Sequence, residues 1–131
     1  MVHAEGADAL DAVANANERM IEFAHRLRQL PEVRRAIPGL NARRYRSGPR
    51  LEAYVEAELV SSTVVCWWIE VGWNDQWRVN SGIYVNDDAG QQVVREFPDR
   101  QAPDSTAFSA ELAIAIDALV ASVADTDLTR F

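Results

Sequence analysis

Lysine is absent from this chain, and all 13 of its basic side chains are arginine. Any mechanism that depends on a lysine amine, such as a Schiff base, a P-loop lysine or a lysine general base, is therefore excluded. Cysteine is nearly absent as well: the single Cys66 has no partner for a disulfide within the chain, which is typical of a reducing compartment. The lack of lysine beside abundant Ala, Val and Asp indicates a GC-rich, bacterial genome.

Long hydrophobic runs are also missing. No stretch of about 18 consecutive apolar residues occurs, and the start of the chain contains neither a basic segment nor an apolar one. We therefore expect no membrane span and no secretory signal, and we expect the protein to reside in the cytoplasm.

The sequence also lacks the motifs of familiar catalytic and cofactor sites, with no GxGxxG, no P-loop and no GxSxG pattern. Neither His3 nor His25 has a second ligand at metal-binding spacing. The acids Asp87 and Asp88 fit a turn better than a calcium loop, and Cys66 fits a structural thiol better than a nucleophile. We expect no metal, no cofactor and no enzymatic activity.

A length of 131 residues with 48% hydrophobic side chains suits a single domain, residues 1–131, with 1–7 and 125–131 expected to be frayed. Apolar residues recur with helical spacing over 8–30, which predicts a helix with Asp8 as its N-cap. A further helical turn is predicted for the residues up to Pro38 and Gly39. Residues 39–50 are predicted to be an arginine-rich connector.

After residue 50 the apolar residues alternate with polar ones, which is the pattern of strands with one buried face. The second and third strands are predicted to form a hairpin with a three-residue loop, placing Trp73 opposite Trp77 and nearly all apolar side chains on one face. A two-residue loop would scatter them over both faces. The predicted strands are 51–59, 63–73, 77–85 and 91–97.

A last helix is predicted to start at Asp104 or Ser105 and to carry an apolar stripe from Phe108 to Val123. Together these elements predict an α+β two-layer sandwich: an N-terminal helix, a four-stranded antiparallel meander and a C-terminal helix, with both helices on one sheet face.

Charge is unevenly distributed along the chain, whose formal net charge is −7. Residues 26–50 carry +7, and the stretch RRAIPGLNARRYRSGPR, residues 34–50, holds six arginines and no acid. These arginines could bind nucleic-acid phosphates, but the acidic remainder of the chain would repel a polyanion. We expect them instead to pair with carboxylates of this chain, of a second copy in a homodimer or of a partner. This secondary charged surface comprises Arg34, Arg35, Arg43, Arg44 and Arg46.

The sheet face away from the helices is predicted to be acidic and aromatic. Tyrosine and tryptophan are frequent anchors of protein interfaces, yet they also stabilise sheets through cross-strand pairs without any partner. Both interpretations stay open. The predicted partner-binding residues are Glu52, Tyr54, Glu56, Glu58, Trp68, Glu70 and Tyr84, and the residues predicted to share their face are Cys66, Arg78, Asn80 and Gly82.

In size, charge and architecture the chain is similar to small bacterial immunity proteins, which neutralise a cognate toxin. The similarity implies a protein-binding protein whose acidic face steers it to a basic toxin surface. The chain is also similar to acidic secretion chaperones, which would need a dimer and an apolar groove for an effector. A nucleic-acid-binding domain, or a small-ligand domain with a cavity beside Trp67, Trp73 or Trp77, is a further alternative.

Overall fold

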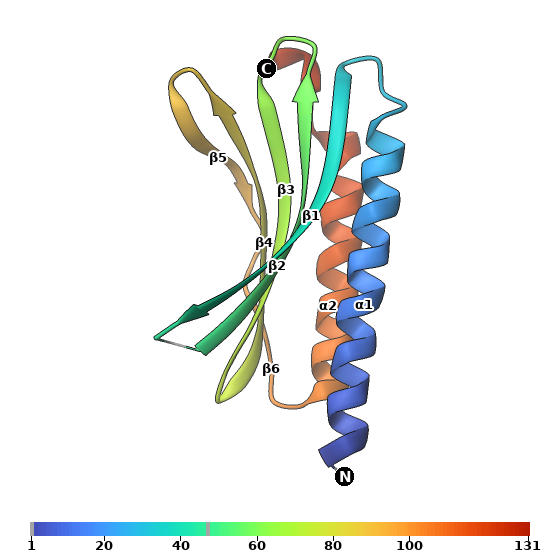
Figure 1. The fold of residues 1–131 in the computed structure, drawn as a ribbon, viewed down its shortest axis with the longest axis vertical. Helices are drawn as coiled ribbons and strands as arrows, with labels where there is room; N and C mark the ends of the chain where they lie inside the picture. Colours follow the sequence, from blue (N-terminus) through green and yellow to red (C-terminus); the bar gives the residue numbers. More distant parts are fainter. Residues whose placement is uncertain (1, 47) are drawn as a thin grey trace.

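Two helices cover one face of an antiparallel sheet, which confirms the predicted α+β two-layer sandwich (Figure 1). The computed structural model describes residues 2–46 and 48–131, and within these ranges the side chains of residues 2–8, Tyr45 and Asn74 lie outside the description. In chain order the elements are α1 (Val2–Leu27), β1 (Val33–Tyr45), β2 (Gly48–Leu59), β3 (Val64–Asn74), β4 (Gln76–Asp87), β5 (Gly90–Glu96), β6 (Arg100–Ala102), α2 (Ser105–Ala121), η1 (Ser122–Asp125) and η2 (Leu128–Arg130).

The sheet has six strands rather than the four predicted. Its order is β1-β2-β3-β4-β5, and β6, in a segment predicted to be loop, pairs with the first part of β4 along the edge that β5 occupies further on. The predicted register of the β3–β4 hairpin is confirmed, with Trp73 opposite Trp77 and Val65 opposite Val85. The alternation of apolar residues was thus a reliable guide to this central hairpin.

Strand β1 occupies residues predicted to be a helical turn and a connector, and both predictions are wrong. The strand pairs with β2 from Val33, opposite Leu59, to Tyr45, opposite Gly48. Pro38 is compatible with this strand because β1 lies at the edge of the sheet, where one side of the backbone has no ladder for proline to interrupt.

Only one of the two helices begins where it was predicted to begin. Helix α1 begins at Val2, so Asp8 lies inside the helix instead of capping it, and the backbone of residues 2–7, predicted to be frayed, continues the same helix. Helix α2 begins as predicted: the Oδ1 atom of Asp104 accepts a hydrogen bond from the backbone N–H of Ala107 at 2.8 Å. This cap satisfies one of the free amides of the first turn.

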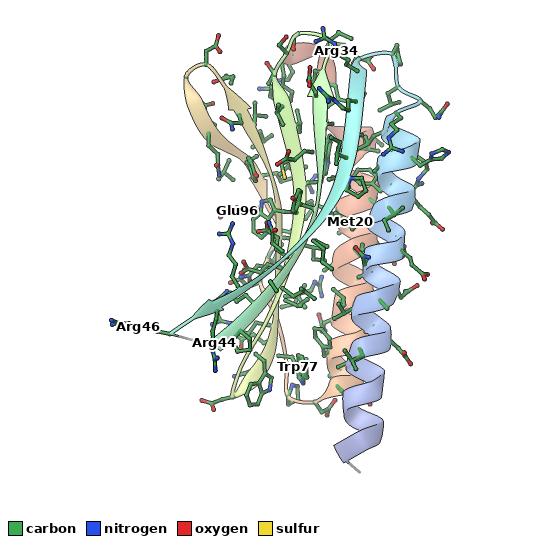
Figure 2. All side chains as sticks on the ribbon, viewed as in Figure 1. Met20, Arg34, Arg44, Arg46, Trp77 and Glu96 are labelled. Atoms are coloured by element: carbon green, nitrogen blue, oxygen red, sulfur yellow. The ribbon has the colours of Figure 1, made fainter. Side chains whose placement is uncertain are left out.

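Aromatic side chains join the helices to the sheet. Trp67 of β3 is fully buried and meets Phe23 of α1 edge-on, with ring centroids 5.5 Å apart. Trp77 of β4 stacks on Phe108 of α2 at 4.5 Å and lies between the lower end of the sheet and the helices in Figure 2. Met20, also labelled there, is 1% exposed between α1 and the sheet. The core therefore lies wholly on the helix side of the sheet.

The C-terminal segment 125–131 was predicted to be frayed, and this prediction is wrong. Leu128, in η2, is only 7% exposed, and the hydroxyl of Thr63 donates a hydrogen bond to the backbone oxygen of Phe131 at 3.1 Å. The tail thus covers the end of the β2–β3 connection.

One helical segment, Ser105–Asp125, is long and apolar enough to cross a membrane by length and composition. The same composition is expected of a core helix, and Phe108, Leu112 and Leu119 of this segment are buried in the core. Packing against the sheet therefore explains those apolar residues of α2 that face the core.

Candidate functional site

The side of the sheet that neither helix covers is called here the open face. It brings together the residues predicted for partner binding, because their strands pair in the register that aligns them. Tyr54 of β2 lies opposite Trp68 of β3, and Trp68 lies opposite Gly82 of β4. One row toward the sheet's lower end, Glu52 lies opposite Glu70. The predicted set therefore forms a continuous surface across β2, β3 and β4.

The two central rings lie along the sheet, each over a glycine of the neighbouring strand. A Cβ on Gly39 of β1 would overlap the Tyr54 ring, and a Cβ on Gly82 would come within 3.0 Å of the Trp68 ring. Both rings are only half-buried. Each ring thus covers a gap in the sheet with one side, which fits sheet stabilisation, and leaves part of its surface open.

Cys66 lies on the predicted side of the sheet, but it is only 1% exposed and so does not contribute to the open surface. It lies between Glu56 on β2 and Tyr84 on β4. Burial raises the pKa of the Cys66 thiol to about 12, and burial together with a hydrogen bond to Cys66 raises the pKa of Tyr84. Both groups are therefore neutral at physiological pH, and the thiol is not poised as a nucleophile.

Two of the predicted carboxylates are neutralised by arginines of the 34–50 stretch. Glu58 accepts hydrogen bonds from Arg34 at 3.1 Å and from Arg35 at 2.8 Å, and these contacts lower its pKa. Glu70 accepts a hydrogen bond from Arg50 at 2.7 Å. The expectation that the arginines of this stretch pair with carboxylates of the same chain is confirmed for Arg34, Arg35 and Arg50.

The remaining carboxylates keep the centre of the open face acidic. Burial, followed by repulsion from Glu70, raises the pKa of Glu52. Glu56 is exposed and makes no ion pair with any described side chain. Glu96 of β5, which the sequence analysis did not select, lies opposite Gly82 and extends the acidic surface to the sheet edge (Figure 2). This strand was predicted as the fourth of the meander, 91–97, but a register shift between Ile83 and Tyr84 hid the placement of Glu96.

The predicted secondary charged surface is not one patch. Arg34 lies at the upper end of β1, whereas Arg44 and Arg46 lie near the tip of the β1–β2 hairpin (Figure 2). At about 3.3 Å per residue, the two groups are separated by roughly 30 Å of extended strand. Arg43, near the second group, acts electrostatically on Glu52.

A cleft of about 850 Å³ lies at the hairpin end of the molecule and is called here the hairpin cleft. The sequence predicted a cavity beside Trp67, Trp73 or Trp77 as one alternative. Trp73, which is 51% exposed, and Trp77 line the hairpin cleft, whereas Trp67 lies in the core. Its other described lining residues are Ala9, Leu10, Val13, Ala42, Arg43, Arg44, Pro49, Arg50, Leu51, Val71 and Gly72.

Among the described residues, no group of three or more His, Cys, Asp or Glu side chains is arranged to hold a metal ion. The chain matches no protein-family model, no curated protein and no solved structure.

Proposed function

We propose that this chain is a protein-binding protein of the immunity type, which inhibits a cognate toxin by covering a basic surface with its open face. The observation that carries the proposal is the composition of that face: half-buried Tyr54 and Trp68 at its centre, with Glu52, Glu56 and Glu96 around them. Aromatic anchors within a charged rim are the common arrangement of protein interfaces.

Electrostatics supports the same proposal. Glu52 and Glu70 lie directly opposite each other on neighbouring strands, and Glu70 still contributes to the raised pKa of Glu52 although Arg50 pairs with Glu70. A basic partner would relieve this repulsion and would be attracted from a distance by the exposed Glu56. The association rate is therefore expected to fall as salt concentration rises.

A dimeric secretion chaperone is the second candidate, and strand β5 favours it. All seven residues of β5 are exposed, with Val93 57% and Val94 40% exposed at the sheet edge. An edge strand of this kind can pair with a second copy or with an extended effector. Light scattering separates the candidates, because the chaperone requires a dimer and the inhibitor is expected as a 14.6 kDa monomer.

The proposal is tested with a charge reversal on the open face and the same reversal elsewhere. A partner captured by the wild-type protein should be lost with Glu56→Arg and retained with Glu22→Arg, which changes an exposed glutamate of α1. The captured partner should be toxic when produced alone and harmless when produced with this protein. Equal retention by both variants would refute the open face as the binding surface.

Trp68→Ala provides the complementary test of the aromatic anchor. Truncating a central interface tryptophan typically costs at least about 2 kcal/mol, so the Kd of the complex should rise by about 30-fold. Because Trp68 is half-buried over Gly82, the variant should remain folded by circular dichroism. Unchanged affinity, or failure of the variant to fold, would contradict the assignment of Trp68 as an anchor.

A further inference from the structure

The hairpin cleft has an apolar interior built by five separate elements, α1 and strands β1 to β4. Helix α1 contributes Leu10 and Val13, and the sheet contributes Leu51, Val71 and Trp73. Leu10 is 73% exposed and Trp73 is 51% exposed, so the fold leaves large apolar side chains in contact with water at this place. Apolar sites of a few hundred cubic ångströms with a small number of polar groups are the usual sites for small ligands.

The charge of the cleft is opposite to that of the molecule. Its described lining residues include three arginines and no acid, in a chain of net charge −7. Arg50 forms an ion pair with Glu70, and the charge of Arg43 attracts that of Glu52; both glutamates belong to the open face. Arg44 is exposed, and no described side chain forms an ion pair with it.

Alternation along β1 places Arg44 on the helix side of the sheet. Ala42 and Leu51 pair across β1 and β2, and Leu51 lies opposite Val71; these residues line the cleft. Arg44 is two residues beyond Ala42 on the same strand, so it shares their face at the end of the hairpin. The cleft therefore combines an apolar interior with a cation at its end.

We propose that the hairpin cleft binds a single-chain amphipathic anion, with its acyl tail against Leu10, Val13 and Trp73 and its carboxylate paired with Arg44. Such a ligand would cover the exposed apolar side chains and supply an anion, which the described lining favours because it contains three arginines and no acid. This site is separate from the surface argued to bind a protein partner, and either can fail without the other.

The first test uses the wild-type protein and a homologous series of octanoate, decanoate and dodecanoate below their micellar concentrations, followed by calorimetry. Each methylene that enters the cleft should tighten binding by about four-fold, equivalent to about 0.8 kcal/mol. Dodecan-1-ol should bind about ten-fold more weakly than dodecanoate, because it lacks the charge that Arg44 would pair with. Tryptophan emission should shift to shorter wavelength as Trp73 leaves water.

Two variants with matched controls locate the ligand. Arg44→Gln should abolish the preference for dodecanoate over dodecan-1-ol, whereas Arg95→Gln, on β5 and outside the cleft, should preserve it. Trp73→Ala should weaken the binding of dodecanoate by about ten-fold or more, whereas Val93→Ala should leave the affinity unchanged. Trp73 and Arg44 are exposed, so folded variants are expected by circular dichroism.

Absence of saturable binding to the wild-type protein, or an affinity independent of chain length, would overturn the proposal. The proposal would also be overturned if Arg44→Gln and Arg95→Gln reduced the preference for dodecanoate equally, because the preference would then depend on the overall charge of the protein and not on Arg44. Vesicles of phosphatidylglycerol form the final arm: attachment to vesicles without binding of monomeric dodecanoate would identify a membrane surface as the occupant and refute a single-chain ligand.

Discussion

Two glycines explain how large rings fit on the open face. Gly39 and Gly82 lack the Cβ atoms that would collide with Tyr54 and Trp68, so each ring can lie across the neighbouring strand. Glycine ordinarily weakens a strand, and an aromatic ring that covers it restores part of the lost packing. The same contact that supports the sheet also holds the rings in a defined orientation, as the proposed binding of a partner requires.

Gly82→Ala is expected to destabilise the protein. The new Cβ would lie 2.8 Å from the backbone oxygen of Arg95 and 3.0 Å from the Trp68 ring, and the backbone cannot move aside without disturbing the β4–β5 pairing. Overpacking of this kind costs about 1–3 kcal/mol, measured as the free energy of unfolding in urea.

Gly72→Ala is the matched control, because its nearest contact would be an ordinary 3.6 Å to the Arg50 side chain. We expect it to be neutral or slightly stabilising. If both alanines had the same effect, the close contacts at Gly82 would not be the cause.

Glu52→Gln is expected to raise thermal stability at pH 7. The fold raises the pKa of Glu52, first through burial and then through Glu70, so the ionised carboxylate is less favourable in the folded than in the unfolded chain. The gain should disappear as the pH falls through the raised pKa to below the ordinary value of 4.5, where wild-type Glu52 is protonated in both states.

Melting temperatures of wild type and variant, measured between about pH 3.5 and about pH 7, test this expectation. A difference that did not depend on pH would show that the glutamate charge is not responsible.

At the scale of elements, β1 shows where a local pattern misleads. Pro38 and Gly39 resemble the end of a helix when they are considered alone. In the sheet, Pro38 is at an edge and Gly39 makes room for Tyr54, so both residues suit a strand. A short signal was present in the sequence: Leu40 and Ala42 alternate with the polar Asn41 and Arg43, but the run is too short to outweigh Pro38 and Gly39.

The C-terminal segment provides the prediction at this scale. Leu128→Ala should cost about 2 kcal/mol of unfolding free energy, because it truncates a side chain that is only 7% exposed. Leu10→Ala, the same change at a side chain that is 73% exposed, should alter stability by less than about 0.5 kcal/mol. Equal effects in urea unfolding would mean that the tail does not pack as described.

At the scale of the whole molecule, charge separation along the sequence becomes charge neutralisation in the fold. The basic stretch forms the hairpin partner of the acidic strand β2, so Arg34 and Arg35 meet Glu58, and Arg50 meets Glu70 on β3. Arg44 and Arg46 lie at the hairpin end, far from the pairs that Arg34 and Arg35 form with Glu58 (Figure 2).

We therefore expect no appreciable affinity for nucleic acid. A labelled single-stranded DNA or RNA of about 20 nucleotides should show no change in fluorescence anisotropy with micromolar protein, even at low salt where phosphate contacts are strongest. A binding curve that weakens steeply as salt is raised would contradict this expectation.

The sequence by itself determined the two helices, strands β2 to β5 and the register of the central hairpin, because alternating apolar residues can be buried together in only one register. It also indicated the acidic, aromatic composition of the open face. Only the tertiary structure decided that β1 is a strand, that Cys66 is buried, that the arginines divide into two groups and that a cleft lies beside Trp73. These features depend on side chains brought together from different strands and helices, and no local pattern specifies such neighbours.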